Sequence, residues 1–435
     1  MVIVWLVTVA YIVIGFLGQN YIADTHYMTF SFLIVTTVLI FSILWIGYTK
    51  YFFVLFLSFF IRLAMLFVDL SESRPTLPHS GEDTENFYET GLQISVNMHM
   101  LDASVYGGLY SKFIGILFNL YGADRLFVQY LNILFALTAI LIVIKIFRML
   151  NVPSHVQGVL VVLMAFFPHS LIFSSILLRE SIISLMVVLS LYCFIRWFLK
   201  KERLSGVASL ILVIAGASFH SAIIAIAIGY IFGFISYRHD QRTLRFSMGS
   251  VVPFGIFAVI MVYILVFPEV VAGLPLFNKF DQILNNDDNI YKTLSSTRGD
   301  TAYLTGLEIN NIFQLILFSP IKIIYFIASP MPWSIRNVND LISFLLDASF
   351  YISALVIFIR NFHLVKTKPL LLIVLIAIVA SWFIFGLGIS NAGTALRHRF
   401  KVFYVIIVAL ALAGAARHKA FQDQKQRSGV GDEAR

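Results

Sequence analysis

The chain is built from long apolar runs that recur from one end to the other. A helix rises about 1.5 Å per residue and needs about 20 mostly apolar residues to cross the hydrocarbon core of a bilayer. Only 12% of the residues are charged, whereas soluble domains typically have about 25%. The repeated runs therefore predict a membrane protein and exclude a water-soluble enzyme, a disordered scaffold and a nucleic-acid-binding domain.

Twelve of these runs are candidate spans, which predicts an all-α, polytopic transmembrane bundle. They cover residues 2–18, 28–48, 51–69, 127–147, 157–174, 180–199, 205–219, 221–237, 249–267, 340–360, 369–389 and 402–416. Two further apolar stretches are ambiguous, since 108–121 is short and 311–329 contains Pro320 and Lys322. The twelve spans alternate correctly only if these two stretches do not cross. We therefore expect two interfacial or re-entrant helices on the outer face, where they line a cavity or pack on protein.

The distribution of charge sets the predicted orientation. The net charge is +8, but most basic residues lie in short loops between apolar runs, as the positive-inside rule describes, so no nucleic-acid partner is expected. Two long loops, 71–106 and 268–309, each contain six acidic residues and are predicted to lie outside. Both termini are then cytoplasmic, with residues 1–416 as one integral membrane domain and 417–435 as a basic cytoplasmic tail.

Carboxylates are concentrated in the first outer loop, where Glu82, Asp83, Glu85 and Glu89 fall within eight residues. A carboxylate beside a membrane surface can act as the general base for a sugar hydroxyl, or it can hold a divalent metal. Spacing alone does not decide between these roles. The alternative is a solvated acidic loop with no chemistry.

A second cluster breaks the predicted charge pattern. Arg397, His398, Arg399 and Lys401 are placed outside by the twelve-span topology, at the start of the last helix. Cations at a helix N-terminus favour phosphate, and arginine binds phosphate oxygens bidentately. The alternative is that one span is miscounted, which would make the cluster an ordinary cytoplasmic anchor.

Five more residues are candidates for binding the substrate on the predicted outer side, and one of them is Tyr88 in the acidic loop. Arg179 and Glu180 lie at the boundary of the span 180–199, either as a functional pair or as a structural ion pair. His220 lies at a predicted outer hairpin tip, and Arg298 lies in the second acidic loop. Within the sequence there is no Gly-rich phosphate loop and no paired-cysteine motif, so ATP-driven transport is not expected.

The order of these features resembles that of the polytopic GT-C glycosyltransferases of bacterial envelopes, which include the protein-mannosyltransferase-like family. It also resembles that of the related membrane polymerases of surface polysaccharides. The resemblance runs in patches over about residues 70 to 415. It is carried by Glu82-Asp83 followed by Tyr88, by Tyr106-Gly-Gly-Leu-Tyr110, by Phe166-Phe167-Pro168, by Leu177-Leu178-Arg179-Glu180 and by Leu396-Arg397-His398-Arg399. Three spans rather than one precede the acidic loop, and the acidic pair has the order Glu82-Asp83.

The resemblance implies a polyprenyl-phosphate-linked sugar as the donor and a saccharide or lipid-linked molecule as the acceptor. The donor phosphate would meet Arg397 and Arg399, together with Arg298, while Asp83 would deprotonate the acceptor hydroxyl and attack would invert the anomeric centre. The expected function is a membrane glycosyltransferase or polymerase at the outer face of the cytoplasmic membrane. Whether a divalent metal takes part in the reaction is left open by the sequence. The alternative is a transporter or flippase of lipid-linked saccharides, although we see none of the internal repeats typical of such folds.

Overall fold

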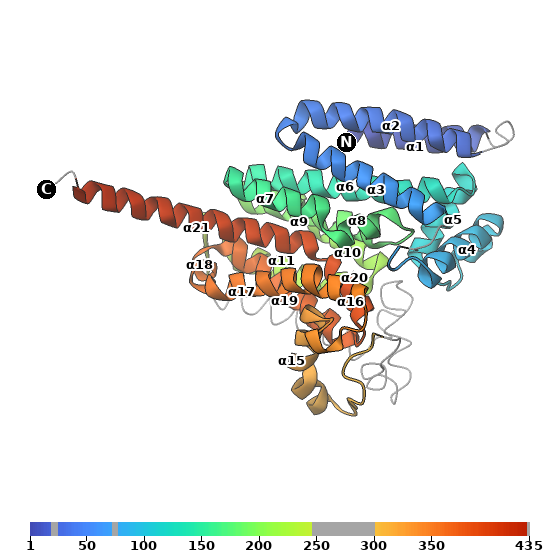
Figure 1. Cartoon of the computed structure of the whole chain (residues 1–435). Coiled ribbons are helices and arrows are strands. Elements are labelled where there is room, and N and C mark those ends of the chain that lie inside the picture. The colour runs from blue at the N-terminus through green and yellow to red at the C-terminus, as the bar shows by residue number, and fades with distance from the viewer. Residues whose placement is uncertain (19–24, 72–76, 246–300, 433–435) are drawn as a thin grey trace. The chain divides into compact units, whose positions relative to one another are not determined.

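The computed structural model describes residues 1–18, 25–71, 77–245 and 301–432, and these are predominantly α-helical (Figure 1). Within the described ranges, the named strands are the two-residue β1 (Tyr237–Arg238) and β2 (Thr243–Leu244), which pair antiparallel. The predicted all-α class is confirmed. The predicted span 249–267 lies outside the described residues.

Seven helices in the described part of the chain are long and apolar enough to cross a membrane: Thr25–Gly47, Thr49–Leu70, Arg125–Met149, Glu180–Lys200, Val338–Arg360, Pro369–Gly388 and Phe403–Gln424. The count becomes eight if α7 (Ser154–Phe166) and α8 (Pro168–Ser175), which meet at 44°, form one span. The break between them has a local cause, because Pro168 at the start of α8 has no amide hydrogen for the preceding turn. The prediction of an all-helical chain with several helices able to cross a membrane is thus confirmed.

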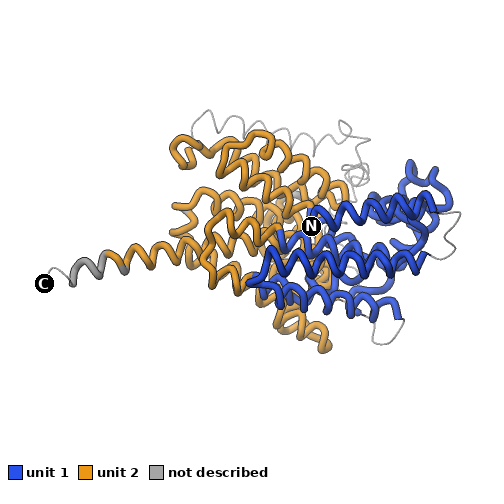
Figure 2. Tube along the Cα trace, turned by 90° about the horizontal axis from the view of Figure 1, so that it is seen from above, with its two compact units in different colours: residues 1–141, 161–185 blue, residues 142–160, 186–435 orange. Residues whose placement is uncertain are grey.

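The first of two compact units comprises residues 1–141 and 161–185 (Figure 2). It contains α1 (Val2–Gly18), α2 (Thr25–Gly47), η1 (Thr49–Tyr51), α3 (Phe52–Leu70), α4 (Glu82–Val96), η2 (Met98–Leu101), α5 (Leu109–Tyr121), α8, most of α6 (Arg125–Met149) and the start of α9 (Glu180–Lys200).

Within unit 1, α4 and α5 lie side by side (Figure 1). Two glycines allow this approach. A Cβ added at Gly91 would lie 2.5 Å from Ile114 Cγ2, and one at Gly115 would lie 2.5 Å from Ile94 Cγ2. Any larger residue would force α4 and α5 apart.

The second unit comprises residues 142–160 and 186–435. It contains α10 (Arg203–Phe219), η3 (Ser221–Ala225), α11 (Ile226–Ser236), α15 (Ile312–Ala328), η5 (Pro332–Ser334), α16 (Val338–Ile342), the π-helical η6 (Ser343–Ala348), α17 (Ser349–Arg360), α18 (Phe362–Thr367), α19 (Pro369–Gly388), α20 (Ala392–Phe400) and α21 (Phe403–Asp432). The orange part of α21 extends beyond the other helices of its unit (Figure 2). Residues 417–432, which were predicted to form most of a basic tail, continue this helix.

Candidate functional site

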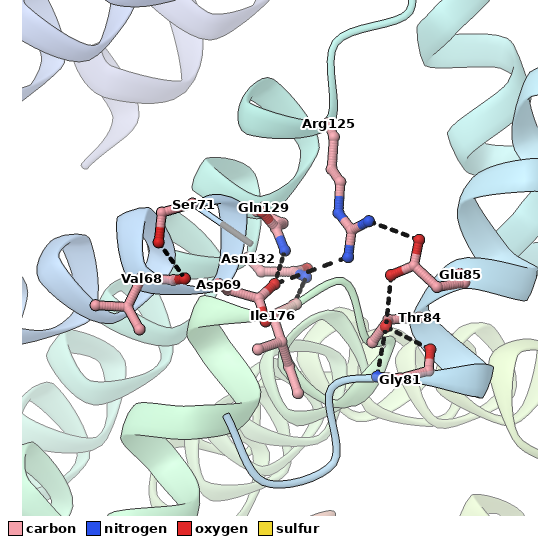
Figure 3. A network of polar contacts seen from close by, with 10 residues as sticks. All are labelled: Val68, Asp69, Ser71, Gly81, Thr84, Glu85, Arg125, Gln129, Asn132 and Ile176. Carbon is pink, nitrogen blue, oxygen red and sulfur yellow. Dashed lines mark hydrogen bonds and ion pairs between the residues drawn. The ribbon is translucent and has the colours of Figure 1, made fainter. Parts of the chain in front are cut away.

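The start of α4 holds the acidic group of unit 1. The Gly81 amide donates to the Thr84 hydroxyl at 3.0 Å, and that hydroxyl donates back to the Gly81 carbonyl at 2.8 Å (Figure 3). These bonds fix the first turn, which contains Glu82, Asp83 and Glu85. Carboxylates are favoured at this end of a helix by its dipole.

One basic side chain ties this turn to two other helices (Figure 3). Arg125 Nη1 lies 2.8 Å from Glu85 Oε2, and its Nη2 lies 3.8 Å from Asp69 Oδ2. Gln129 donates to the same Asp69 oxygen at 2.6 Å. The Arg125 guanidinium carbon is also 5.7 Å from the ring centroid of Tyr88, so this predicted site residue belongs to the network.

The predicted catalytic pair has a different environment from Glu85. Glu82 is exposed, and Asp83 is partly exposed and accepts a hydrogen bond from the Tyr106 hydroxyl. Asp83 is therefore held by a side chain outside α4, unlike Glu85, which binds Arg125. It keeps access to solvent, which a base for an incoming hydroxyl requires.

A buried ring connects Asp83 to the other candidates of unit 1. The ring centroid of Phe87 lies 5.5 Å from that of Tyr106 and 5.1 Å from that of Tyr110, and the Arg179 guanidinium lies 5.9 Å from it. Burial raises the pKa of Tyr110, and the negative charge of Glu180 adds to the rise. Asp83, Arg179 and Glu180 thus all lie near the aromatic side chains of Phe87, Tyr106 and Tyr110.

Hydrogen bonds from a side chain of α6 fix the turn that precedes Arg179 and Glu180. Asn132 donates to the carbonyls of Ile176 and Leu178, each at 3.0 Å, and to the Tyr110 hydroxyl at 3.3 Å. Asn132 was not among the residues predicted from the sequence. It is an amide in the middle of an apolar run, where a polar group needs hydrogen-bond partners, and that position could have identified it.

Arg62, a charge inside an apolar run, is bound by neutral acceptors in unit 1. It is 2% exposed and donates to the hydroxyls of Ser170 and Ser174 at 2.9 and 3.0 Å. It also donates to the Ala165 carbonyl, 3.2 Å away, beside the break between α7 and α8. These bonds connect α3 to the bent pair and indicate a structural role.

Unit 2 contains a cavity of about 240 Å³ at the C-terminal end of α15. Its lining residues come from the segment before α15, from the last turn of α15, from the turns that follow it, from α16 and from the start of α20: Thr301, Ala302, Tyr303, Tyr325, Ser329, Pro330, Met331, Trp333, Ser334, Arg336, Asp340 and Ala392. One wall is fixed by backbone bonds, because Tyr303 donates to the Ser390 carbonyl and Ala392 donates to the Thr301 carbonyl, both at 2.9 Å. The cavity is therefore largely pre-formed.

A buried ion pair lies in the same unit. Arg399 Nη2 is 2.5 Å from Asp347 Oδ2, and both side chains are completely buried. Arg399 Nη1 donates to the carbonyls of Phe326 and Ile327 at 2.9 and 2.8 Å, at the end of α15. Asp347 lies in η6, and π-helical turns inside α-helices occur frequently at functional sites.

The ion pair is electrostatically close to the cavity wall. Burial raises the pKa of Tyr303, a cavity residue, and the positive charge of Arg399 opposes this rise. Lys322, which is 1% exposed, donates to the Ser390 hydroxyl at 3.2 Å. A guanidinium and an ammonium group are therefore fixed near one wall of the cavity.

The predicted cation cluster lies at a different place along its helix than expected. Arg397, His398 and Arg399 form the last turn of α20, and α21 begins only at Phe403. The dipole at a helix C-terminus favours cations, so the position contributes to the stability of α20 whatever else these side chains bind. His220 Nε2 lies 2.9 Å from His398 Nε2, so the structure brings the predicted His220 to this cluster.

The remaining predictions divide between the units or fall outside the described residues. Glu82 and Asp83 belong to unit 1, whereas Arg397 and Arg399 belong to unit 2. Arg298 lies outside the described residues. Within the described ranges, no group of three His, Cys, Asp or Glu side chains is arranged to hold a metal ion.

Neither the cavity of unit 2 nor the pairing of Arg399 with Asp347 was predicted from the sequence. Asp347 stands in an apolar run and Arg399 precedes another, and a buried charge in a membrane usually has a partner of opposite sign. That rule predicts a partner for each charge but does not say which residue it is.

No protein-family model, no curated protein and no solved structure matches the chain.

Proposed function

We propose that the protein is a membrane glycosyltransferase that uses a polyprenyl-phosphate-linked sugar at the outer face of the cytoplasmic membrane, to build cell-surface polysaccharide or glycoconjugate. A growing saccharide as acceptor would make it a polymerase. The proposal includes the twelve-span topology with two outer helices and with both termini in the cytoplasm. The observation that carries it is a fixed, buried Arg399 behind the wall of a pre-formed cavity in an otherwise apolar chain.

The chemistry follows from the two kinds of charged group. Departure of a lipid phosphate leaves negative charge, which cations fixed before the reaction stabilise without reorganisation. Arg397 is half-buried and adjacent to the anchored Arg399, so it is the cation proposed to contact the phosphate. Asp83, held by Tyr106 but accessible, is proposed to take the proton of the acceptor hydroxyl while Glu82 supports it.

One observation favours the alternative, a transporter or flippase of lipid-linked saccharides. A buried ion pair inside a span, such as Asp347–Arg399, is typical of transport pathways as well as of structural pairs. A transporter moves an intact lipid-linked sugar across the bilayer, whereas a transferase forms a new glycosidic bond. Product analysis separates the two functions.

The test measures sugar transfer in vesicles that contain the purified full-length protein, a panel of polyprenyl-phosphate sugars and a saccharide acceptor. We expect a new glycoside, and Asp83→Asn should reduce its formation by about 10²–10⁴-fold, the usual contribution of a general base. Glu89→Gln is the matched control, because Glu89 is exposed on the same helix. Intact donor moved across the bilayer with no new bond would establish the transporter instead.

Sidedness is tested separately by labelling single cysteines placed at residue 90 and at the exposed residue 394 with a membrane-impermeant maleimide in intact cells. The proposed topology places both positions outside. Labelling of residue 394 only after the cells are opened would show that a span is miscounted and that the basic cluster is a cytoplasmic anchor.

A further inference from the structure

The cavity of unit 2 contains a buried hydroxyl that needs a partner. Ser329 follows the end of α15 and is 1% exposed. Among the residues that the structure describes, its Oγ has no hydrogen-bond partner, and the residue lines the cavity. A buried hydroxyl without a partner destabilises a protein, so a ligand that supplies a hydrogen bond recovers this free energy on binding.

The charges that line the cavity cancel. Arg336 Nε lies 3.4 Å from Asp340 Oδ2, and the Arg336 amide donates to the same oxygen at 3.2 Å. Among the lining residues themselves, one cation and one anion held together leave no excess charge, and they offer donors and acceptors side by side. Such a lining suits an uncharged ligand with several hydroxyl groups.

Aromatic rings supply the apolar part of the lining. The ring centroids of Tyr303 and Tyr325 lie 5.3 Å apart, and Trp333 is 73% exposed beside them. A pyranose has an apolar face of C–H groups, which packs on such rings, and a rim of hydroxyls. The volume of about 240 Å³ is below the range of about 300–1,000 Å³ typical of drug-sized ligands, so it suits one ring.

The surroundings of the cavity are apolar and exposed. Towards the end of α15 that borders the cavity, Ile321 is 42% exposed and Ile324 56%. Past the cavity, Val338 is 70% exposed. Exposed apolar helix faces of a membrane protein contact lipid tails, and tryptophan is enriched at the depth of the headgroups. The cavity is therefore open to the polar head of a lipid rather than to solutes alone.

We propose that this cavity binds one uncharged pyranose unit of a lipid-linked saccharide, with Ser329 and Asp340 bonding its hydroxyls and the tyrosines packing on its ring. The lipid-linked nature of the ligand rests on the proposed function. The recognition of a neutral sugar ring rests on the cavity alone.

The experiment measures binding of methyl glycosides of glucose, galactose and N-acetylglucosamine to the full-length protein by calorimetry. Nanodiscs free of sugar-based detergent are used, because such detergents would compete. We expect at least one glycoside to bind and inorganic phosphate not to displace it. Ser329→Ala should weaken binding about tenfold, the value of one lost hydrogen bond, and leave the Tm unchanged or higher.

Ser218→Ala is the matched control, since its hydroxyl bonds to the Ile214 carbonyl in an exposed part of the same unit, and it should bind as the wild type does. A Ser329→Ala protein that binds as tightly as the wild type, or a panel in which no glycoside binds, would overturn the proposal. Displacement by inorganic phosphate would also overturn it. Glycoside binding without sugar transfer would refute the proposed function and leave the cavity assignment standing.

Discussion

The buried pair of Arg399 and Asp347 gives the sharpest stability prediction. Both side chains are fully buried. Asp347→Asn removes the negative charge that balances the Arg399 guanidinium, and this guanidinium cannot become neutral by losing a proton. Removing one partner of such a pair costs about 3–5 kcal/mol of unfolding free energy. The carbonyls of Phe326 and Ile327 still accept from Arg399, so we expect a value near the lower end, about 3 kcal/mol.

The assay is unfolding of the purified protein in mixed micelles with increasing SDS, followed by circular dichroism. Arg399→Met should cost less than Asp347→Asn, because a carboxyl left alone can take up a proton. The double variant should recover most of the loss, since an apolar replacement of both partners is often neutral. Asp240→Asn is the control, because Asp240 is 90% exposed and pairs only loosely with Lys201. A loss of less than about 1 kcal/mol for Asp347→Asn, as in a surface pair, would refute the reasoning.

Two further outcomes follow from local geometry. Gly91→Ala and Gly115→Ala should each lower unfolding free energy by about 1–3 kcal/mol, whereas Gly158→Ala, with no atom within 4 Å of an added Cβ, should be neutral or stabilising in the same SDS titration. Equal effects at all three glycines would contradict the close contact of α4 and α5. Hydrogen bonding from Arg196 lowers the pKa of Glu202, so the stability that this pair contributes is present above the unfolded value of about 4.3 and is lost as pH falls through the folded value. Between pH 6 and 3 the Tm should therefore fall more steeply for the wild type than for an Arg196→Met variant. Parallel curves of Tm against pH would count against a contribution from this pair.

The placement of helices was largely predictable from the sequence, because hydropathy and turn residues are local. The predicted run 157–174 corresponds to α7 and α8, and Phe167-Pro168 marks their break. The number of spans does not follow from the same signal. Helices such as Arg203–Phe219 are apolar but shorter than a full crossing, so length alone leaves their status open.

The candidate site was predictable only as a set of residue types. A charge in an apolar run signals a partner, which holds for Asp347, but one sequence does not say that the partner is Arg399. The cavity depends on backbone bonds between 301–303 and 390–392, which are far apart in sequence. Its most informative group, Ser329, is an ordinary hydroxyl until the fold buries it.

The central claim is that the carboxylate of Asp83 and the guanidinium of Arg397 both face the outer side of the membrane. Its most direct test is the accessibility of spin labels on single cysteines introduced by Asp83→Cys or Arg397→Cys, in a Cys193→Ser background reconstituted in vesicles of known orientation. We predict that ascorbate added on the outer side reduces both labels. Reduction of the two labels from opposite sides of the membrane would contradict the account.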